Sequence, residues 1–394
     1  MESNALFDRH LAQTTPYPIG LEIERAEGTY LYTTEGKRYM DLISGVGVSA
    51  LGHGNPAVRE AIKSQVDRHM HVMVYGEYLQ LAQSDAAATL TRLLPDGLDT
   101  VYFVNSGAEA NEAALKLARR VTGRTEMIAF AGGYHGGTTG ALALSGNEQK
   151  KYAFRPLLTD VRHIRLNDFE ALKHITERTA GVVLETIQGD AGIRIPDAKW
   201  MKALRTRCTT VGALLILDEI QCGLGRAGSW FAFEQFGIVP DVLTLGKALG
   251  AGMPVGALVA GRARMEQFTH DPILGHITTF GGHPVICAAV NAGLLELERS
   301  FIIPGVSRKG RRFRTHLGDH EQVVEFRQAG LFMAVELASP EAVQQVVEYC
   351  LERGVIGFWF LSCPKAFRLA PPLVISYDEI DTACAIIRKA LDQL

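Results

Sequence analysis

The sequence predicts an α/β protein in which a mostly parallel sheet is covered by helices. Short apolar runs alternate with helical stretches between about residues 54 and 287, a pattern typical of strand–helix–strand units. An acidic residue directly follows one of these runs, in the position where open sheets of this kind place their ligands. The strands are expected near residues 101–104, 127–130, 182–185, 213–217, 242–245 and 256–260.

Outside this region, the two ends of the chain are expected to form a smaller portion. Residues 28–42 predict a hairpin that turns at Glu35-Gly36-Lys37. After Pro284, the stretch CAAVNAGLLELERS predicts a long helix that carries the chain into a C-terminal α+β portion. The predicted organisation is an N-terminal segment 1–53, a large domain 54–287 and a C-terminal small domain 288–394.

In the segment VYFVNSGAEANEAALKLARR, a strand leads into an Ala-rich helix. Ser106 and Glu109 have the spacing of a capping box, which predicts that the helix begins there. Free N–H groups at such a start, with Gly107 beside them, form a site for a phosphate. Taken alone, the segment is equally an ordinary helix start.

Two further segments add an aromatic ring and a carboxylate. In AGGYHGGTTG, Tyr134 and His135 lie between glycine pairs, so an aromatic face can approach a flat ligand. In GALLILDEIQ, Asp218 ends an aliphatic run and requires a cationic partner, because an unpaired buried charge is costly. The alternatives are a flexible glycine loop and an acid paired with an arginine.

Lys247 is the only charged residue between residues 242 and 261. Loss of water in apolar surroundings favours the neutral amine, which is the form that attacks a carbonyl. The alternative is a lysine whose stem packs on apolar surface while its tip reaches solvent. In chain order, Ser106, Tyr134, Asp218 and Lys247 supply a phosphate cradle, a ring platform, a partner for a protonated pyridine nitrogen and an aldehyde-capturing amine. Together they predict a pyridoxal 5′-phosphate site.

In these and neighbouring motifs, the sequence resembles the class III (ω-amino-acid) pyridoxal-phosphate aminotransferases, and most closely the acetylornithine and ornithine aminotransferases. The resemblance implies fold type I, with a mostly parallel seven-stranded sheet in the large domain and a small α+β domain built from both termini. The runs that carry it span residues 36–372: GKRYMDLISGVGVSALGHGNP, NSGAEANEAALKLAR, YHGG, LETIQGDAG, ILDEIQCGLGRAG, LGKALGAGMPVGA, TTFGGHP and FRLAPPL.

The resemblance also implies roles for individual residues. Lys247 would hold the cofactor and then move a proton between substrate and cofactor, and Asp218 would pair with the pyridine nitrogen. Gln221 would contact the ring hydroxyl, and Tyr134 would stack on the ring, with His135 in the same loop. The phosphate would be held by Ser106, Gly107 and Ala108, and by Thr279 of the other subunit, which implies a homodimer with shared active sites.

For the substrates, the resemblance implies an amino acid and a 2-oxo acid. Arg368 matches an arginine that binds a substrate carboxylate, with Asp190 and Glu185 of the LETIQGDAG run as further substrate-binding residues. Two residues depart from the family pattern: Asp190 replaces the usual glutamate of QGE, and Gly137 stands where many acetylornithine-type members have an arginine. Both departures concern substrate choice and leave the cofactor set intact.

Other protein classes share parts of this pattern. A pyridoxal-phosphate racemase or aminomutase would share the cofactor residues. Residues 223–228 match GxGxxG after a strand, as in an NAD-dependent dehydrogenase, but no acid follows about twenty residues later. A non-enzymatic binding protein on the same scaffold would have little need of Lys247.

Length and composition favour a large soluble enzyme, the scattered cysteines favour the cytoplasm, and the resemblance implies a role in amino-acid metabolism. The net charge of −3 gives no sign of nucleic-acid or membrane-surface binding. The N-terminus MESNALFDRHLAQTTPYP is not expected to be a signal peptide, and no apolar run is long enough for a membrane span. The six cysteines form no CxxC pair and the twelve histidines show no metal spacing, so no metal is expected. Cys222, inside the cofactor motif, is expected to be a small buried residue rather than a reactive thiol.

Overall fold

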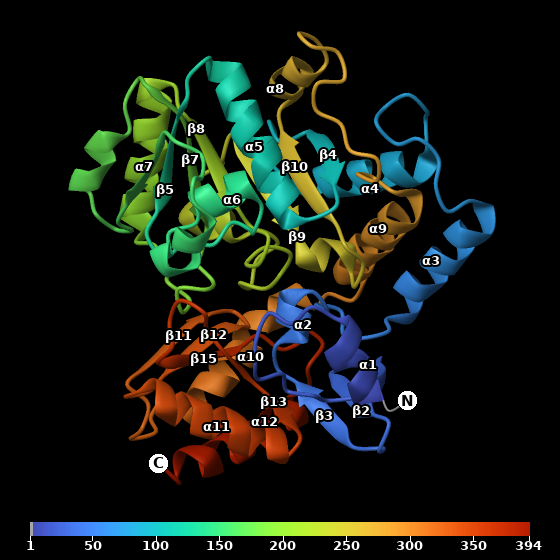
Figure 1. The fold of residues 1–394 in the computed structure, drawn as a ribbon, viewed down its shortest axis with the longest axis vertical. Helices are drawn as coiled ribbons and strands as arrows, with labels where there is room; N and C mark the ends of the chain where they lie inside the picture. The colour runs from blue at the N-terminus through green and yellow to red at the C-terminus, as the bar shows by residue number, and fades with distance from the viewer. Residues whose placement is uncertain (1–2) are drawn as a thin grey trace.

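The computed structural model describes residues 3–394, so Met1 and Glu2 of the predicted N-terminal segment 1–53 lie outside the described residues. Figure 1 shows two layered parts. The upper one contains the middle of the chain, and the lower one contains both ends, coloured blue and red. Within residues 3–394, no helix is long and apolar enough to cross a membrane.

The upper part is built on a seven-stranded sheet. Four neighbouring pairs, β9–β8, β8–β7, β7–β5 and β5–β6, are parallel, and β10 runs antiparallel to both of its neighbours. The mostly parallel sheet predicted from the sequence is therefore confirmed. In spatial order the strands are β4 (Thr100–Val104), β10 (Gly256–Ala260), β9 (Val242–Gly246), β8 (Leu214–Asp218), β7 (Thr179–Glu185), β5 (Glu126–Phe130) and β6 (Val161–Ile164).

Two strands differ from the sequence-based expectation. β7 begins at Thr179, three residues before the predicted start, because Thr179, Ala180 and Gly181 are buried in the sheet although they form no apolar run. β6 was not predicted. Its sequence, VRHI, includes two basic residues, and it lies at the edge of the sheet, where only Ile164 is buried. Edge strands need no continuous apolar run, so periodicity does not reveal them.

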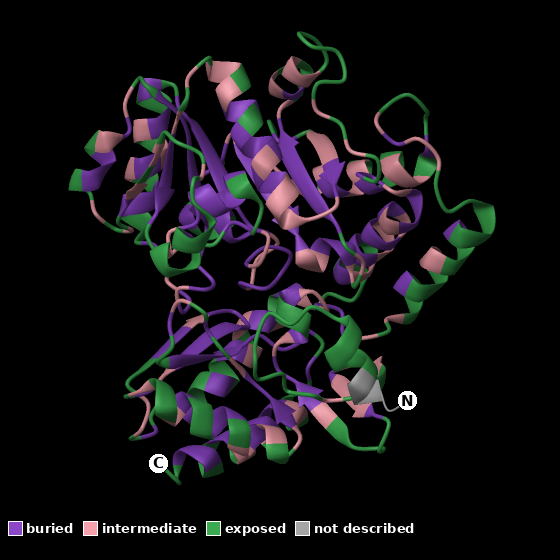
Figure 2. Ribbon diagram, viewed as in Figure 1, coloured by how far each residue is buried: buried purple, intermediate pink, exposed green. Residues whose placement is uncertain are grey.

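Helices cover both faces of the sheet. Leu214 and Ile216 of β8 pack with Ala114 and Leu117 of α5 (Gly107–Thr122). The alternate residues Leu215 and Leu217 belong to the cluster of Trp200 in α7 (Ala198–Val211). Burial on both faces explains why the central strands read as continuous apolar runs, and Figure 2 shows them buried along their length. The remaining helices of this part are α3 (Pro56–Arg68), α4 (Leu81–Arg92), α6 (Thr139–Leu144), α8 (Arg262–Met265) and α9 (Pro284–Arg299).

The lower part contains two four-stranded sheets. The predicted hairpin is confirmed: β2 (Tyr30–Thr33) pairs antiparallel with β3 (Arg38–Asp41), and β1 (Ile23–Glu27) extends it. β13 (Val355–Ile356) pairs parallel with β3 and so joins the C-terminal portion to the N-terminal one. The second sheet has the order β11 (Glu325–Ala329), β12 (Phe332–Glu336), β15 (Ala366–Leu369) and β14 (Phe358–Trp359). The helices are α1 (Ser3–His10), the short α2 (Ser44–Gly47), α10 (Ile303–Leu317), α11 (Pro340–Glu352) and α12 (Tyr377–Leu391).

Candidate active site

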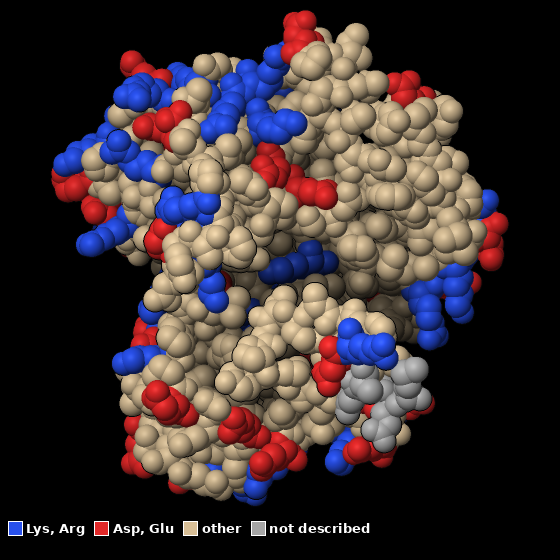
Figure 3. Space-filling model, viewed as in Figure 1, with Lys and Arg blue, Asp and Glu red and all other residues tan. Residues whose placement is uncertain are grey.

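A cavity of about 200 Å³ lies at the carboxyl ends of β7, β8 and β9, beside the first turn of α5. In Figure 3 the face shown is hollowed between the two parts of the molecule, and Lys or Arg atoms are visible in the hollow. The lining brings together eight of the predicted site residues with three neighbours. It consists of Gly107, Ala108, Tyr134, His135, Gly136, Gly137, Glu185, Asp218, Ile220, Gln221 and Lys247.

Lys247 directly follows β9 and lines the cavity. Its φ of 47° lies in the left-handed region, which is costly for a residue with a side chain and is found mostly at functional sites. Loss of water, and then the charge of Arg368, lower the pKa of the Lys247 amine to about 8. The lowered pKa is the direction predicted from the apolar sequence around this lysine.

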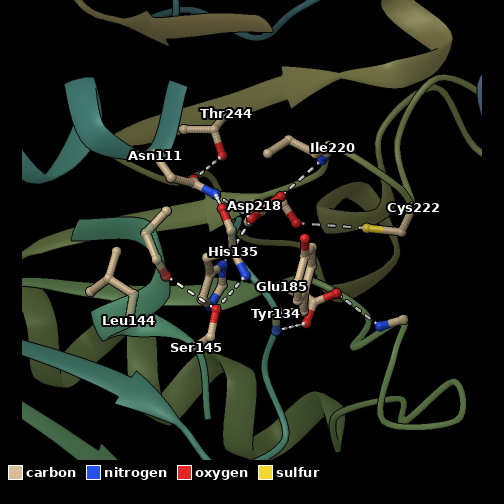
Figure 4. A network of polar contacts seen from close by, with 12 residues as sticks. Asn111, Tyr134, His135, Leu144, Ser145, Glu185, Asp218, Ile220, Cys222 and Thr244 are labelled. Atoms are coloured by element: carbon tan, nitrogen blue, oxygen red, sulfur yellow. Dashed lines mark hydrogen bonds and ion pairs between the residues drawn. The ribbon is translucent and has the colours of Figure 1, made fainter. Parts of the chain in front are cut away.

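Asp218 is held by a buried network, drawn in Figure 4. Its Oδ2 accepts hydrogen bonds from Asn111 Nδ2 at 2.8 Å and from His135 Nδ1 at 2.8 Å, and its Oδ1 accepts the N–H of Ile220 at 3.0 Å. The amide of Asn111 is fixed in turn, because Thr244 Oγ1 donates to its Oδ1 at 2.9 Å. The carboxylate therefore accepts hydrogen bonds from α5, from the Tyr134 loop and from the turn after β8, while β9 acts on it only through Asn111.

The partners of Asp218 differ from those that the sequence suggested. The alternative of a paired arginine is wrong, because among the described residues its ion-pair partner is His135. Burial by itself lowers the pKa of His135, but the hydrogen bond to Asp218 and its charge raise that pKa above its usual value. No motif in the sequence indicated Asn111 or Thr244 as site residues. Asn111 does share the buried face of α5 with Ala114 and Leu115, and a polar residue on such a face is a signal worth following.

The first turn of α5 begins where the capping pattern predicted. Ser106 is the N-cap, and its hydroxyl accepts the N–H of Glu109 at 3.2 Å. Only this half of the capping box forms. The Glu109 carboxylate accepts from the backbone N–H of Asn105 at 2.7 Å and from its side chain at 2.9 Å, and not from Ser106.

The cavity wall next to this turn is tightly packed. A Cβ on Gly107 would lie 2.7 Å from the side chain of Ile220, and one on Gly136 would lie 2.5 Å from Cβ of Ala108. Glycine at these two positions lets the loop after Tyr134 and the turn after β8 approach the helix start closely. The backbone N–H groups of that start therefore face a narrow cavity.

Glu185 connects two loops of the site. Its Oε1 accepts the N–H of Tyr134 at 2.8 Å, and its Oε2 accepts the N–H of Gly189 at 2.9 Å. Burial raises the pKa of this carboxyl to about 7. Glu185 was predicted to bind substrate. It does line the cavity, but both of its oxygens already accept backbone hydrogen bonds.

These groups fit pyridoxal 5′-phosphate. The helix start can hold a phosphate, the half-exposed ring of Tyr134 can lie on a flat ligand, and Asp218 can face a ring nitrogen. Nε2 of Gln221 is buried and has no hydrogen-bond partner among the described residues, so a ligand acceptor would satisfy it. Lys247 supplies an amine that gives up its proton readily.

Arg368, on β15, is buried yet poorly satisfied. Its only side-chain hydrogen bond within residues 3–394 is the 3.4 Å contact from Nη2 to Oδ1 of Asp190, and its buried Nε has no partner there. The guanidinium also lies over the ring of Phe360, 4.5 Å from its centroid. Buried Arg226, by contrast, donates to the carbonyl oxygens of Leu331 and Pro371. Burial lowers the pKa of Arg368, and a bound carboxylate would compensate that cost.

Two other predicted features are not among the residues that line the cavity. Thr279 is exposed and is not among the lining residues, whereas its neighbour Thr278 accepts a hydrogen bond from Asn105 Nδ2 at 2.9 Å. The GxGxxG run at 223–228 forms turns and does not begin an α-helix, so the dinucleotide-binding interpretation of it is wrong. Cys222 is buried, and burial raises the pKa of its thiol well above the usual value, as expected of an unreactive residue.

Comparison with known proteins places the chain in a family of aminotransferases, in agreement with the cofactor residues. Residues 12–391 match the family described as aminotransferase class-III. The chain is 39% identical to an acetylornithine aminotransferase of Methanopyrus kandleri over 99% of both chains. It is 34% identical to a [LysW]-aminoadipate semialdehyde/glutamate semialdehyde transaminase of Sulfolobus acidocaldarius, over 94% of this chain and 95% of the relative. The ornithine aminotransferase of Toxoplasma gondii, a structure with partial occupancy of PLP at its active site, superposes with a TM-score of 0.92 at 28% identity, covering 99% of this chain and 93% of its own.

Proposed function

The chain belongs to the class-III aminotransferases, which depend on pyridoxal 5′-phosphate, and we propose that it transfers an amino group from an ω-amino acid to a 2-oxo acid. The donor would resemble ornithine or acetylornithine, and the acceptor would be a 2-oxo acid such as 2-oxoglutarate. The observation that carries this proposal is Arg368, a buried and poorly satisfied guanidinium whose charge acts on Lys247.

Bound pyridoxal 5′-phosphate supplies an aldehyde for an amine and a ring that withdraws electrons. The first turn of α5, at Ser106, Gly107 and Ala108, would hold its phosphate, and Tyr134 would lie against its ring. Asp218, oriented by Asn111 and His135, would keep the ring nitrogen protonated. Gln221 Nε2 would donate to the ring hydroxyl.

Lys247 would work as the base that moves a proton at the substrate carbon. With a pKa of about 8, well below that of an ordinary lysine, the amine loses its proton more readily near neutral pH, which suits a group that takes and returns protons. Its position at the end of β9, in a strained backbone conformation, keeps the amine beside Asp218 and Glu185 in one cavity.

Arg368 would bind a carboxylate of the substrate through its planar, forked guanidinium. The two departures from the family pattern bear on what else is recognised. Asp190 has a shorter reach than a glutamate, and a Cβ at Gly137 would meet no atom within 4 Å, so the wall where many relatives carry an arginine is open. We therefore expect an acceptor range that differs from that of ordinary members and extends to pyruvate.

The assembly is proposed to be a homodimer with shared active sites. Thr279 is exposed and does not line the cavity of its own chain, which suits a hydroxyl that reaches the phosphate held by a partner subunit. Exposed Ile277 and Phe280 on either side of it would be covered by that partner.

The test is a half-reaction screen. The yellow holoenzyme is mixed with each candidate amino acid, and conversion to the pyridoxamine form is followed by its absorbance. Conversion by ornithine, acetylornithine or a related ω-amino acid, followed by recovery with a 2-oxo acid, is the expected result. If no amino donor converts the enzyme and a substrate instead loses optical rotation, the aminotransferase assignment gives way to a racemase.

Arg368→Ala should raise the KM for the carboxylate substrate strongly, since a charged hydrogen bond is worth about 1.5–3 kcal/mol. The borohydride-reducible cofactor content should stay at the wild-type level, because Arg368 is not among the residues that line the cofactor cavity. An unchanged KM would show that the carboxylate is bound elsewhere.

A further inference from the structure

The carboxylate beside Arg368 is held mainly by a loop and only weakly by the arginine. Ser362 Oγ donates to Asp190 Oδ2 at 2.6 Å, and the N–H of Leu361 donates to its Oδ1 at 3.1 Å. The contact from Arg368 is 3.4 Å, longer than a good N–H···O bond. Asp190 is therefore fixed by residues that follow β14, and it compensates the charge of Arg368 only partly.

The direction of the Ser362 O–H bond is determined by Asn147, the other side chain that bonds to this hydroxyl. Asn147 Nδ2 donates to Ser362 Oγ at 2.8 Å. The orientation of that amide is set by its other end, because Asn147 Oδ1 accepts the N–H of Gln149 at 3.0 Å. With Asn147 as the donor, the single proton of Ser362 points to Asp190. A short hydrogen bond from a hydroxyl to a carboxylate is among the stronger kinds.

We propose that Ser362 is a positioning residue that holds Asp190 back from Arg368 and so keeps the guanidinium available for the substrate carboxylate. This inference rests on the proposed function, in which Arg368 binds that carboxylate. Without the hydroxyl, Oδ2 of Asp190 is free to turn toward the poorly satisfied guanidinium. A closer ion pair between Asp190 and Arg368 then competes with every carboxylate that enters the site.

The network also links two distant stretches of the chain. Asp190 and Asn147 belong to loops of the part that carries the seven-stranded sheet, whereas Ser362 and Arg368 belong to the C-terminal sheet. Ser362 lies between Asn147 and Asp190 and forms a hydrogen bond with each. The position of the loop after β14 thus determines how closely Asp190 approaches Arg368, and therefore how much of the charge of Arg368 it neutralises.

The test measures binding of glutarate, a dicarboxylate with neither an amino nor an oxo group, to the holoenzyme by titration of its absorbance. Ser362→Ala should raise the Kd for glutarate roughly five-fold, the loss expected when one hydrogen bond is removed and a competitor is released. Asp190→Asn should bind glutarate at least as tightly as the wild type, because it carries no competing charge. In Asp190→Asn, adding Ser362→Ala should change nothing further, and Ser362→Thr should retain wild-type binding.

The matched control is Ser300→Ala, which removes a 2.8 Å hydrogen bond from a serine to the Glu296 carboxylate at the end of α9 and should leave the Kd unchanged. Asn147→Ala removes the other hydrogen bond of the Ser362 hydroxyl and should also raise the Kd for glutarate. A wild-type Kd in both Ser362→Ala and Asn147→Ala, or an effect of Ser362→Ala that persists in Asp190→Asn, overturns the proposal. Arg368→Lys separates the two levels: if it loses glutarate binding while Ser362→Ala does not, the positioning role fails and the proposed carboxylate site stands. If it binds glutarate as the wild type does, the carboxylate site itself fails.

Discussion

At the scale of single residues, the site depends on how burial changes the charge of each group. Lys247, Glu185 and Arg368 all lose water, which lowers the pKa of the two basic groups and raises that of the carboxyl. The buried carboxylate of Asp218 accepts hydrogen bonds from Asn111 and His135. The same physical cause therefore produces a reactive amine at one position, while hydrogen bonding keeps a carboxylate in place at another.

The lowered pKa of Lys247 predicts a pH dependence for cofactor uptake. Only the neutral amine attacks an aldehyde, so covalent capture of pyridoxal 5′-phosphate by the apoprotein should speed up as pH rises and level off above about 8. An ordinary lysine, with its pKa near 10.4, would still be accelerating at pH 10. Stopped-flow absorbance between pH 6 and 10 measures the midpoint, with Lys247→Ala as the non-capturing control. A rate that climbs without a plateau up to pH 10 would contradict the assignment.

Asp218→Asn should keep the fold and some cofactor but lose most activity. An amide cannot hold the pyridine nitrogen protonated, so the negative charge left after proton removal is poorly stabilised. The measurement is kcat together with cofactor content and far-ultraviolet circular dichroism. Activity within a few-fold of the wild type would show that Asp218 is not the ring partner.

At the scale of elements, the site is assembled where strands end and one helix begins. α5 starts at a side-chain cap and ends at Gly123, whose φ of 67° only glycine adopts easily, so local sequence signals define both ends. The loop that carries Tyr134 must then approach this helix start closely. Gly136, with a φ of 133°, makes that approach possible.

Gly136→Ala should therefore weaken cofactor binding. Its Cβ would lie 2.5 Å from Ala108 Cβ in a backbone conformation that L-residues rarely adopt, a strain of about 1–3 kcal/mol that displaces the loop from the helix. Gly137→Ala is the matched control, since its Cβ meets no atom within 4 Å. Equilibrium dialysis of the cofactor compares the two variants. Equal affinities would mean that the close approach is unimportant for the phosphate site.

At the scale of the whole molecule, Thr279, which we propose acts in the site of a partner subunit, is exposed and does not line the cavity of its own chain. Exposed apolar residues next to Thr279 give a reason for association, since burial of Ile277 and Phe280 favours a second copy. The network from Asn147 through Ser362 to Asp190 joins the C-terminal sheet to the part that carries the seven-stranded sheet, so it requires that both parts be docked.

We predict a homodimer in which Thr279→Ala weakens cofactor retention. Loss of one hydroxyl donor to a phosphate should cost about 1.5–3 kcal/mol of cofactor binding without dissociating the subunits. Sedimentation at micromolar concentration and cofactor release in dilute buffer are the two measurements, with Thr269→Ala as an exposed-loop control. A fully active monomer would contradict the dimer, and unchanged retention would remove Thr279 from the phosphate site.

The amino-acid sequence by itself determined most of the sheet, the start of α5 and the placement of Asp218 and Lys247 at the ends of strands. These follow from short-range causes: strands buried on both faces read as apolar runs, a serine caps a helix, and an isolated lysine loses water among apolar neighbours. The same causes do not identify β6, an edge strand with little burial.

Only the tertiary structure decided which side chains complete the site. Asn111 meets Asp218, Thr244 meets Asn111, and Ser362 meets Asp190, although the members of each pair lie more than a hundred residues apart. No periodicity or cap encodes such contacts, because a hydrogen bond between distant residues exists only after packing has fixed both elements within about 3 Å. For that reason the sequence indicated the cofactor, while the setting of the arginine proposed to bind the substrate carboxylate became visible only in the folded molecule.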